Sequence, residues 1–303
     1  MKEEPLISVA LCTYNGEKFI SQQLDSILCQ TYKHLEIIIV DDCSTDGTFN
    51  IVSSYAKKDS RIKCFKNEVN KGFNKNFGYA ITLTKGEYIA ISDQDDIWFP
   101  PKMELLLNNI NDEWLIFSNS CYINDRNEII PGEILKNFNL EISNYKGILL
   151  ANFITGHTTL FKREFLDYFL PLPEAGFYDW WMGFVALYHQ KATVLNEVLT
   201  QYRIHESSVM QRRLNSGQAK LAENKTIDVM LSAFASYKDL AYQDKIFIEE
   251  LKNAYKLNLS RRNSTYLITI ILKYYEALFP NQKRRKRLSL LNFAFKYARK
   301  TKN

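Results

Sequence analysis

Short apolar runs alternate with helix-like spacing of apolar residues along the first 120 positions of the chain. Four runs predict strands because each is too short for a helix. They are LISVALC, LEIIIV, RIKCF and EYIAIS, at residues 6–12, 35–40, 61–65 and 87–92. Apolar residues three or four positions apart predict helices at 20–28, 51–55, 73–81 and 103–110. Alternation of this kind predicts an α/β fold with a mainly parallel sheet flanked by helices.

The pattern becomes looser after residue 120. A hairpin is predicted around Asn124 to Asn127, followed by a short strand, two helices and two further strands. Their ranges are 158–161, 162–169, 179–190, 192–195 and 199–203. From about 208 onward the chain is helical in pattern, polar and rich in aromatics. We therefore expect one domain over 1–207, with halves at 1–120 and 121–207, and a helical extension over 208–303.

Polar residues follow each of the first four predicted strands. They are Thr13-Tyr14-Asn15, Asp41-Asp42, the segment from Asn67 to Asn76, and Asp93-Gln94-Asp95-Asp96. Any one of them can be an ordinary turn. Ligands of such sheets bind beyond the carboxyl ends of the strands, so all four are expected at one edge.

Three carboxylates within four residues need a compensating partner. At about 4 Å and an effective dielectric near 20, two like charges repel by roughly 4 kcal/mol. Close carboxylates respond by a raised pKa or by binding a cation. The sequence from Asp93 to Asp96 therefore predicts a positive group at the end of the fourth strand.

Several other chemistries lack their motifs. The turn after the first strand, TYNGEKF, has one glycine, which argues against a dinucleotide-binding fold. Neither a phosphate-binding G-x-x-x-x-G-K-[ST] loop nor a G-x-S-x-G nucleophile turn occurs in the sequence. A D-x-D phosphatase stays open because Asp93 and Asp95 have that spacing, although Ile97 departs from the usual pattern.

Composition supports a globular chain with an uneven charge. Of the 303 residues, 46% are apolar, which is ample for a buried core. The formal charge is +5, but residues 281–303 hold nine Lys or Arg and no acid. The 39 basic residues less those nine leave 30 against 34 acids in the first 280 positions, a net charge of −4. The basic character therefore belongs to the C-terminal segment.

Five scattered cysteines without a C-x-x-C pair predict reduced thiols rather than disulfides or a zinc site. The sequence offers no signal peptide pattern and no stretch of about 20 apolar residues. We therefore expect a cytoplasmic protein.

Taken together, these segments resemble family 2 of the inverting glycosyltransferases, which use nucleotide sugars and have the GT-A fold. The resemblance covers roughly residues 6–205. It is carried by SVALCTYNGEKF, QTYKHLEIIIVDDCSTDGT, NKGFNKNFGYA, KGEYIAISDQDDIWFPPK, FITGHTTLFKREF, FYDWW and YRIHESS. The forms SDQDDIW and DWW look most like bacterial rhamnosyltransferases of surface-polysaccharide biosynthesis.

The resemblance implies a metal-dependent hexosyltransferase with Mn²⁺ or Mg²⁺ as cofactor. It places the metal on Asp95 and Asp93, with His205 close to the metal or diphosphate. It also implies that a dTDP- or UDP-linked sugar lies along residues from all four polar clusters. The nucleotide-sugar residues are Thr13, Tyr14, Asn15, Glu17, Asp41, Asp42, Asn70, Asn76, Asp93 and Gln94.

Catalysis and the acceptor are assigned in the same way. Asp179 in YDWW matches the general base of the family, which takes the proton of the acceptor hydroxyl. The implied acceptor-binding residues are Trp98, Gly156, His157, Trp180 and Trp181. A non-catalytic module of the same fold that binds sugar nucleotides or glycans stays open as an alternative.

The C-terminal segment KRRKRLSLLNFAFKYARK combines five consecutive bases with apolar residues on one helical face. A basic amphipathic helix can bind an anionic membrane surface. We therefore expect peripheral attachment to the inner face of the cytoplasmic membrane, near lipid-linked glycan acceptors. Nucleic-acid binding, the other use of such a run, is not expected, and a homo-oligomer is compatible with the sequence.

Overall fold

The computed structural model describes residues 4–136, 138–139, 144–205, 219–260 and 264–300. These residues form two compact units, each described here by itself. Unit 1 comprises residues up to 136, 153–174 and 189–205, and unit 2 comprises 137–152, 175–188 and the residues from 206 onward. The segments 137–152 and 175–188, expected with the sheet, therefore group with the C-terminal helices.

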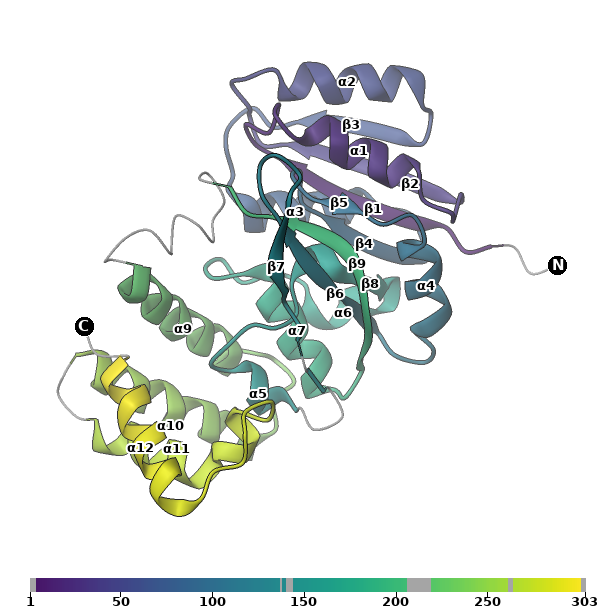
Figure 1. Cartoon of the computed structure of the whole chain (residues 1–303). Helices are drawn as coiled ribbons and strands as arrows, with labels where there is room; N and C mark the ends of the chain where they lie inside the picture. Colours follow the sequence, from purple (N-terminus) through teal and green to yellow (C-terminus); the bar gives the residue numbers. More distant parts are fainter. Residues whose placement is uncertain (1–3, 137, 140–143, 206–218, 261–263, 301–303) are drawn as a thin grey trace. The chain divides into compact units, whose positions relative to one another are not determined.

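Unit 1 is built on one sheet, in which the described residues form nine strands (Figure 1). The strand order is β3-β2-β1-β4-β8-β6-β9-β5, with β7 paired to β6. Strands β3, β2, β1 and β4 are parallel neighbours, and β6 is parallel to β9. The bounds are β1 Ile7–Thr13, β2 Leu35–Asp41, β3 Ile62–Lys66, β4 Tyr88–Ser92, β5 Ile97–Trp98, β6 Leu115–Ile123, β7 Ile129–Glu133, β8 Thr159–Lys162 and β9 Ala192–Arg203.

The predicted α/β fold with a mainly parallel sheet is confirmed. The helices of unit 1 are α1 Ile20–Leu28, α2 Thr48–Lys58, α3 Phe73–Leu83, α4 Lys102–Asn109 and α6 Leu166–Phe169, with short 3-10 turns η1 Gly156–Thr158 and η2 Arg163–Phe165. One prediction was wrong: the two strands expected at 192–195 and 199–203 are the single strand β9. Its pairing with β6 shifts register around Asn119, so the strand continues through an irregular stretch.

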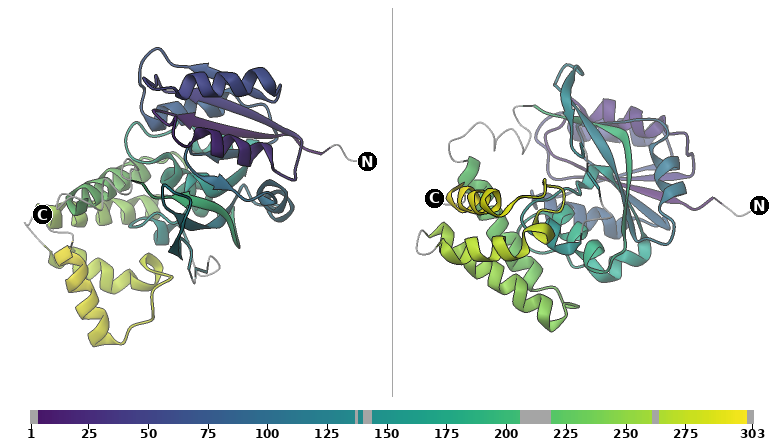
Figure 2. Two further views of the ribbon diagram at one scale, coloured as in Figure 1. Left: turned by 45° about the horizontal axis from the view of Figure 1, so that its top comes forward. Right: turned by 60° about the horizontal axis from the view of Figure 1, so that its bottom comes forward.

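Unit 2 is helical. Its helices are α5 Tyr145–Ile148, α7 Tyr178–Tyr188, α9 Ala219–Ala235, α10 Tyr242–Leu259, α11 Thr265–Leu278 and α12 Arg287–Lys300. Helix α9 packs on α7 and α10, and α11 packs on α10 and α12 (Figure 2). Stacked aromatic rings join α7 to α9, with Phe184 and Phe234 centred 4.4 Å apart. Burial of such rings is the main stabilising contribution in a unit of this kind.

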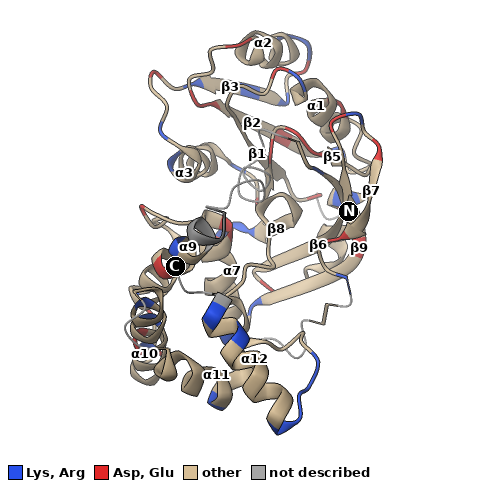
Figure 3. Cartoon of the chain, turned by 60° about the vertical axis from the view of Figure 1, so that its left-hand side comes forward, with Lys and Arg blue, Asp and Glu red and all other residues tan. Residues whose placement is uncertain are grey.

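Helix α12 exposes apolar as well as basic residues on its outer side. Its inner side carries the buried Ala294 and Ala298 and the half-buried rings of Phe293 and Tyr297. Leu288 and Phe295, by contrast, are 82% and 55% exposed. Lys and Arg residues occur along α12 and in the segment before it (Figure 3). Within the described residues, no helix combines the length and apolarity that a membrane crossing requires.

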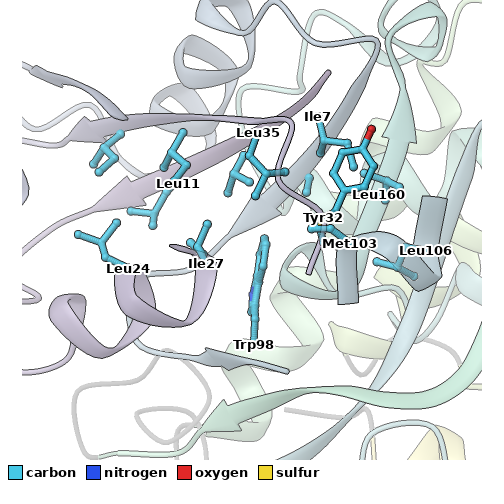
Figure 4. Close-up of a cluster of buried hydrophobic side chains, with 14 of the residues drawn as sticks. Ile7, Leu11, Leu24, Ile27, Tyr32, Leu35, Trp98, Met103, Leu106 and Leu160 are labelled. Atoms are coloured by element: carbon cyan, nitrogen blue, oxygen red, sulfur yellow. The ribbon is translucent and has the colours of Figure 1, made fainter. Parts of the chain in front are cut away.

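The apolar core of unit 1 stabilises the edge of the sheet at which β4 ends. Ile20, Leu24 and Ile27 share one buried face of α1, at the i, i+4, i+7 spacing of a helix that packs on a sheet. Together with Leu11 of β1 and Trp98 of β5 they form one apolar cluster (Figure 4). Each such side chain contributes about 1.5–3 kcal/mol when fully buried. The polar turn between β4 and β5 is therefore anchored at both ends.

Candidate active site

The three acids predicted to need a cation form the turn between β4 and β5, here called the acid turn (residues 93–96). Gln94 ties this turn to the end of β1 through two hydrogen bonds. The backbone N of Tyr14 donates to Gln94 Oε1 at 2.8 Å, and Gln94 Nε2 donates to the Tyr14 carbonyl at 3.1 Å. A Cβ on Gly16 would collide with the Gln94 amide, so a larger residue there would displace the Gln94 side chain from these bonds.

Asp95 and His205 face each other at the acid turn. The His205 Nε2 atom lies 2.8 Å from Asp95 Oδ2, and the two side chains are 12% and 18% exposed. The structure thus brings together two residues that are 110 positions apart and that the sequence assigned to one metal site.

Asp96 points inward from the same turn. Its Oδ1 accepts the backbone N–H of Arg203 at 3.0 Å, and its Oδ2 has no hydrogen-bond partner within the described part of the chain. Burial and the charges of Asp95 and Asp93 raise the pKa of the Asp96 carboxyl well above its usual value. An unsatisfied buried oxygen is a feature that a cation would relieve.

His157 lies beside Asp96 and Asp93. Its Nδ1 atom is 3.8 Å from an oxygen of each carboxylate, and the ligand atoms of these three residues lie within 4.8 Å of one another. Burial, assisted by the charge of Lys102, lowers the pKa of His157 to about 3, so the imidazole is neutral at pH 7. The contacts at 3.8 Å are therefore not ion pairs. With Ser120 Oγ 3.1 Å from Nε2, a proton on Nε2 would leave Nδ1 as a lone pair toward the carboxylates, as in a metal ligand.

The fully buried side chain of Lys102 lies beside this group. Lys102 Nζ donates to the His157 carbonyl at 2.5 Å and to Thr200 Oγ1 at 2.9 Å, and it lies 3.7 Å from the centre of the Trp98 ring. Burial lowers the pKa of Lys102 well below its usual value, whereas Asp96 and Asp93 act in the opposite direction. Lys102 is thus a buried basic side chain next to the acid turn, with burial as the main influence on its pKa.

The polar residues after β2 hold two loops in place. Asp41 accepts from Thr13 Oγ1 at 3.0 Å and from the backbone N of Ser44 at 2.9 Å. Asp42 accepts the backbone N–H groups of Lys71 and Gly72 at 2.8 and 2.9 Å. Its carboxylate therefore organises the start of the segment before α3.

Amide side chains complete that segment. Asn67 Nδ2 donates to both Asp42 Oδ1 and Asn76 Oδ1 at 2.8 Å, and Asn76 Nδ2 donates to the Val40 carbonyl. Asn70 Nδ2 donates to the Asp42 carbonyl at 3.2 Å. The structure therefore places the predicted Asp42, Asn70 and Asn76 in one hydrogen-bonded network at the end of β2.

The turn after β1 is joined to the one after β2 in the same way. Asn15, which has a positive φ of 49°, accepts the Thr45 N–H on Oδ1 at 2.9 Å. Glu17 Oε2 accepts the Gly47 N–H at 2.5 Å. The Tyr14 ring, by contrast, is 48% exposed. These loops form a fixed frame from which the Tyr14 side chain projects into solvent.

The predicted acceptor residues are mostly buried. Trp98 is in the core of unit 1, and Gly156 and His157 are buried in η1. In unit 2, Trp180 Nε1 donates to the Ile148 carbonyl at 2.6 Å, and Trp181 stacks on Phe234. Asp179 is partly exposed in the first turn of α7, where its Oδ1 accepts the Trp180 N–H at 2.7 Å.

Three residues at the site were not selected from the sequence: Asp96, Lys102 and Arg203. Asp96 belongs to the acidic cluster, but its inward orientation depends on the pairing of β5 with β9. Lys102 follows two prolines at the first turn of α4, where a lysine looks like a solvent-exposed residue. Arg203 lies in the YRIH segment, and its position two residues before His205 was the one feature of the sequence that could have pointed to it.

A mainly parallel sheet, an acidic turn after β4 and cross-linked loops after β1 and β2 define the GT-A class of nucleotide-sugar transferase folds. The model of the family described as glycosyl transferase family 2 matches residues 8–169, more than half of the chain. The chain belongs to this family and is a glycosyltransferase.

Two relatives illustrate the similarity. An uncharacterized glycosyltransferase of Haemophilus influenzae is 29% identical over 92% of this chain and 94% of its own length. The Escherichia coli protein WfaP, a UDP-Glc:α-D-GlcNAc-diphosphoundecaprenol β-1,3-glucosyltransferase, is 34% identical over 67% of this chain and 79% of its own length.

Solved structures support the fold. TarS 1–349 from S. aureus, in complex with UDP-GlcNAc, superposes with a TM-score of 0.62 at 19% identity, over 91% of this chain and 82% of that one. The mannosyltransferase PcManGT from Pyrobaculum calidifontis, in complex with GDP-Man and Mn²⁺, gives a TM-score of 0.54 at 18% identity over 90% and 88%.

Proposed function

We propose that this glycosyltransferase moves a hexose from a nucleoside diphosphate donor to a hydroxyl group of a glycan acceptor and inverts the anomeric configuration. The observation that carries the proposal is the facing pair of Asp95 and His205 after β4, at 2.8 Å. Such strand ends are where folds of this class bind nucleotides. The family match supports sugar transfer as the chemistry.

The proposed cofactor is Mn²⁺ or Mg²⁺, held by Asp95, Asp93 and His205. Asp95 Oδ2 and His205 Nε2 lie 2.8 Å apart, so both atoms would be within reach of one ion. Asp93 is 36% exposed, so a diphosphate can reach an ion in this position, whereas Asp96 and His157 are buried. When bound, the ion would neutralise charge on the departing diphosphate.

We assign the nucleotide to the loops after β1 and β2. The exposed Tyr14 ring offers a flat face to the donor, and the fixed loops at Asn15 and Glu17 frame it. Asp42 is proposed to meet the base, while Asp41, already bonded to Thr13 and Ser44, supports the loop.

Asp179 is the proposed general base. The first turn of a helix stabilises a carboxylate, which keeps Asp179 ready to accept a proton. The proton of the acceptor hydroxyl passes to Asp179 as the acceptor oxygen bonds to the anomeric carbon. The bond from that carbon to the diphosphate oxygen breaks, and the nucleoside diphosphate leaves with the electron pair.

The proposed acceptor is a growing surface polysaccharide or a lipid-linked glycan, and α12 is proposed to bind the cytoplasmic membrane surface. WfaP and WfgD from Escherichia coli, whose names specify a diphosphoundecaprenol-linked acceptor, support this choice. The exposed Leu288 and Phe295 beside basic residues supply apolar and electrostatic attraction to an anionic bilayer. The donor is proposed to be dTDP-rhamnose or a UDP-hexose.

The family match favours neither of the alternatives left open by the sequence. A phosphatase would release inorganic phosphate without an acceptor, and a non-catalytic module would bind donor without turnover. Product analysis of a donor–acceptor reaction separates all three.

The test is a donor panel of UDP-Glc, UDP-GlcNAc and dTDP-rhamnose with Mn²⁺, measured by thermal shift. One donor should raise the melting temperature of the wild type, because a ligand stabilises the form that binds it. Asp95→Ala should lose this Mn²⁺-dependent shift. The matched control is Asp59→Ala, because Asp59 also forms an ion pair at 2.8 Å and is 25% exposed, but it lies before β3. A donor shift that survives in Asp95→Ala would refute the metal assignment.

A further inference from the structure

The Arg203 side chain, 1% exposed at the end of β9, connects three separate segments of unit 1. Its Nε donates to the Asp95 carbonyl at 2.6 Å. One terminal nitrogen donates to the Asn124 carbonyl at 2.9 Å and to Asn127 Oδ1 at 2.7 Å, and the other donates to Gln22 Oε1 at 3.0 Å. Four of the five N–H donors of the guanidinium therefore have partners.

These four partners are neutral carbonyl or amide oxygens, so the fork of donors matters here more than the charge. The Phe19 ring lies 4.5 Å from the guanidinium carbon and packs against it. A lysine would keep the positive charge, but as a point charge it could not bond all three segments.

One of the segments that Arg203 connects carries Asp95, and His205 lies on the segment of Arg203 itself. Its side chain holds the Asp95 backbone, and its backbone N–H donates to Asp96 Oδ1 at 3.0 Å. His205 follows two residues later, which in an extended chain places both side chains on the same side. Arg203 therefore anchors the backbone of Asp95 directly and lies two residues before His205 on the same segment.

We propose that Arg203 is a positioning residue that sets the separation of the Asp95 carboxylate and the His205 imidazole, and thereby the affinity for a divalent cation with a nucleoside diphosphate. The inference rests on the proposed function, because that function supplies the cation. Residues that orient metal ligands typically change metal affinity by 10- to 100-fold when substituted.

The experiment measures Mn²⁺ binding to the full chain by electron paramagnetic resonance, with UDP as the nucleotide probe. Arg203→Lys retains the charge and loses the fork, and we expect at least a tenfold weaker Mn²⁺ affinity. The matched control is Arg163→Lys, because Arg163 also donates both to a backbone and to a side-chain oxygen. It bonds the Gly86 carbonyl at 2.6 Å and Thr84 Oγ1 at 3.0 Å, and both acceptors precede β4, at the end away from the acid turn. It should leave Mn²⁺ affinity within twofold.

A double-mutant cycle separates positioning from general destabilisation. In a His205→Asn background, Arg203→Lys should change Mn²⁺ affinity less than twofold, because the pair it orients is already broken. Asn127→Gly serves if Arg203→Lys does not fold, since Asn127 has a φ of 66° that glycine adopts freely and only its bond to Arg203 is lost. This variant should weaken Mn²⁺ binding about threefold with little change in melting temperature.

Two results would overturn the inference alone: an unchanged Mn²⁺ affinity in both Arg203→Lys and Asn127→Gly, or an equal loss in Arg203→Lys and Arg163→Lys. A wild-type protein that binds UDP but no Mn²⁺ would overturn the metal assignment together with this inference.

Discussion

Asp179 is the residue on which the proposed chemistry depends most directly. Asp179→Asn keeps the size and the hydrogen bond to the Trp180 N–H, but it removes the proton acceptor. We expect the transfer rate to fall about 10²- to 10⁴-fold, the usual contribution of a general base. Donor affinity measured by calorimetry should stay within twofold.

The control for this substitution is Asp228→Asn on α9, another partly exposed aspartate of unit 2. It should leave the rate unchanged. An Asp179→Asn enzyme with most of its activity would show that another group takes the proton.

At the residue scale, the sequence indicated which side chains carry charge but not which ones are buried. It predicted that the acid turn needs a positive partner, and the structure has two buried basic side chains there, Lys102 and Arg203, although burial lowers the pKa of both. Their role could not be predicted because it arises from contacts with Thr200, Asn127 and other residues distant in sequence. The sequence likewise could not show that Asp96 is fully buried whereas Asp95 is partly exposed.

At the scale of single elements, α12 makes the membrane proposal testable. Leu288→Ser with Phe295→Ser removes two exposed apolar groups from the helix and leaves every base in place. We expect about a tenfold lower partition coefficient onto phosphatidylglycerol vesicles in co-sedimentation, because each lost apolar group reduces burial in the bilayer interface. Binding to neutral vesicles should be weak for both proteins.

The control uses Tyr242→Ser with Ile246→Ser on α10, because these residues are also apolar and exposed. Their loss should not change vesicle binding. Equal partitioning of the α12 variant and the wild type would contradict attachment through this helix.

Elements with a strong local pattern were predicted well, and those fixed by distant pairing were not. All seven residues of β1 and of β2 are buried, and both strands are mostly apolar, with Ser8 and Glu36 as interior polar residues. Strand β5 has only two residues and exists through its pairing with β9, which no local pattern reveals. The start of β6 was missed because Ser118, Asn119 and Ser120 interrupt its apolar run, although they are buried.

For the whole molecule, hydrogen exchange can locate the donor site without a choice of sugar. With Mn²⁺ and UDP, exchange should slow at residues 13–17, 41–47, 67–76 and 93–96 of unit 1, because a ligand suppresses the openings of the loops that bind it. At 100 times the dissociation constant, the stabilisation is about 2.7 kcal/mol. Exchange in α10 and α11 is expected to be unchanged, which provides an internal control. Protection confined to those helices would place the nucleotide elsewhere.

The two hydrogen bonds between the Gln94 amide and the Tyr14 backbone do not depend on which side chain occupies position 14. Because Gln94 bonds only main-chain atoms, position 14 can exchange its side chain while the link between the two strand ends persists. A substitution at position 14 can therefore change this exposed side chain and still preserve the link. Position 16 differs, because any Cβ there would push the Gln94 amide out of this pairing.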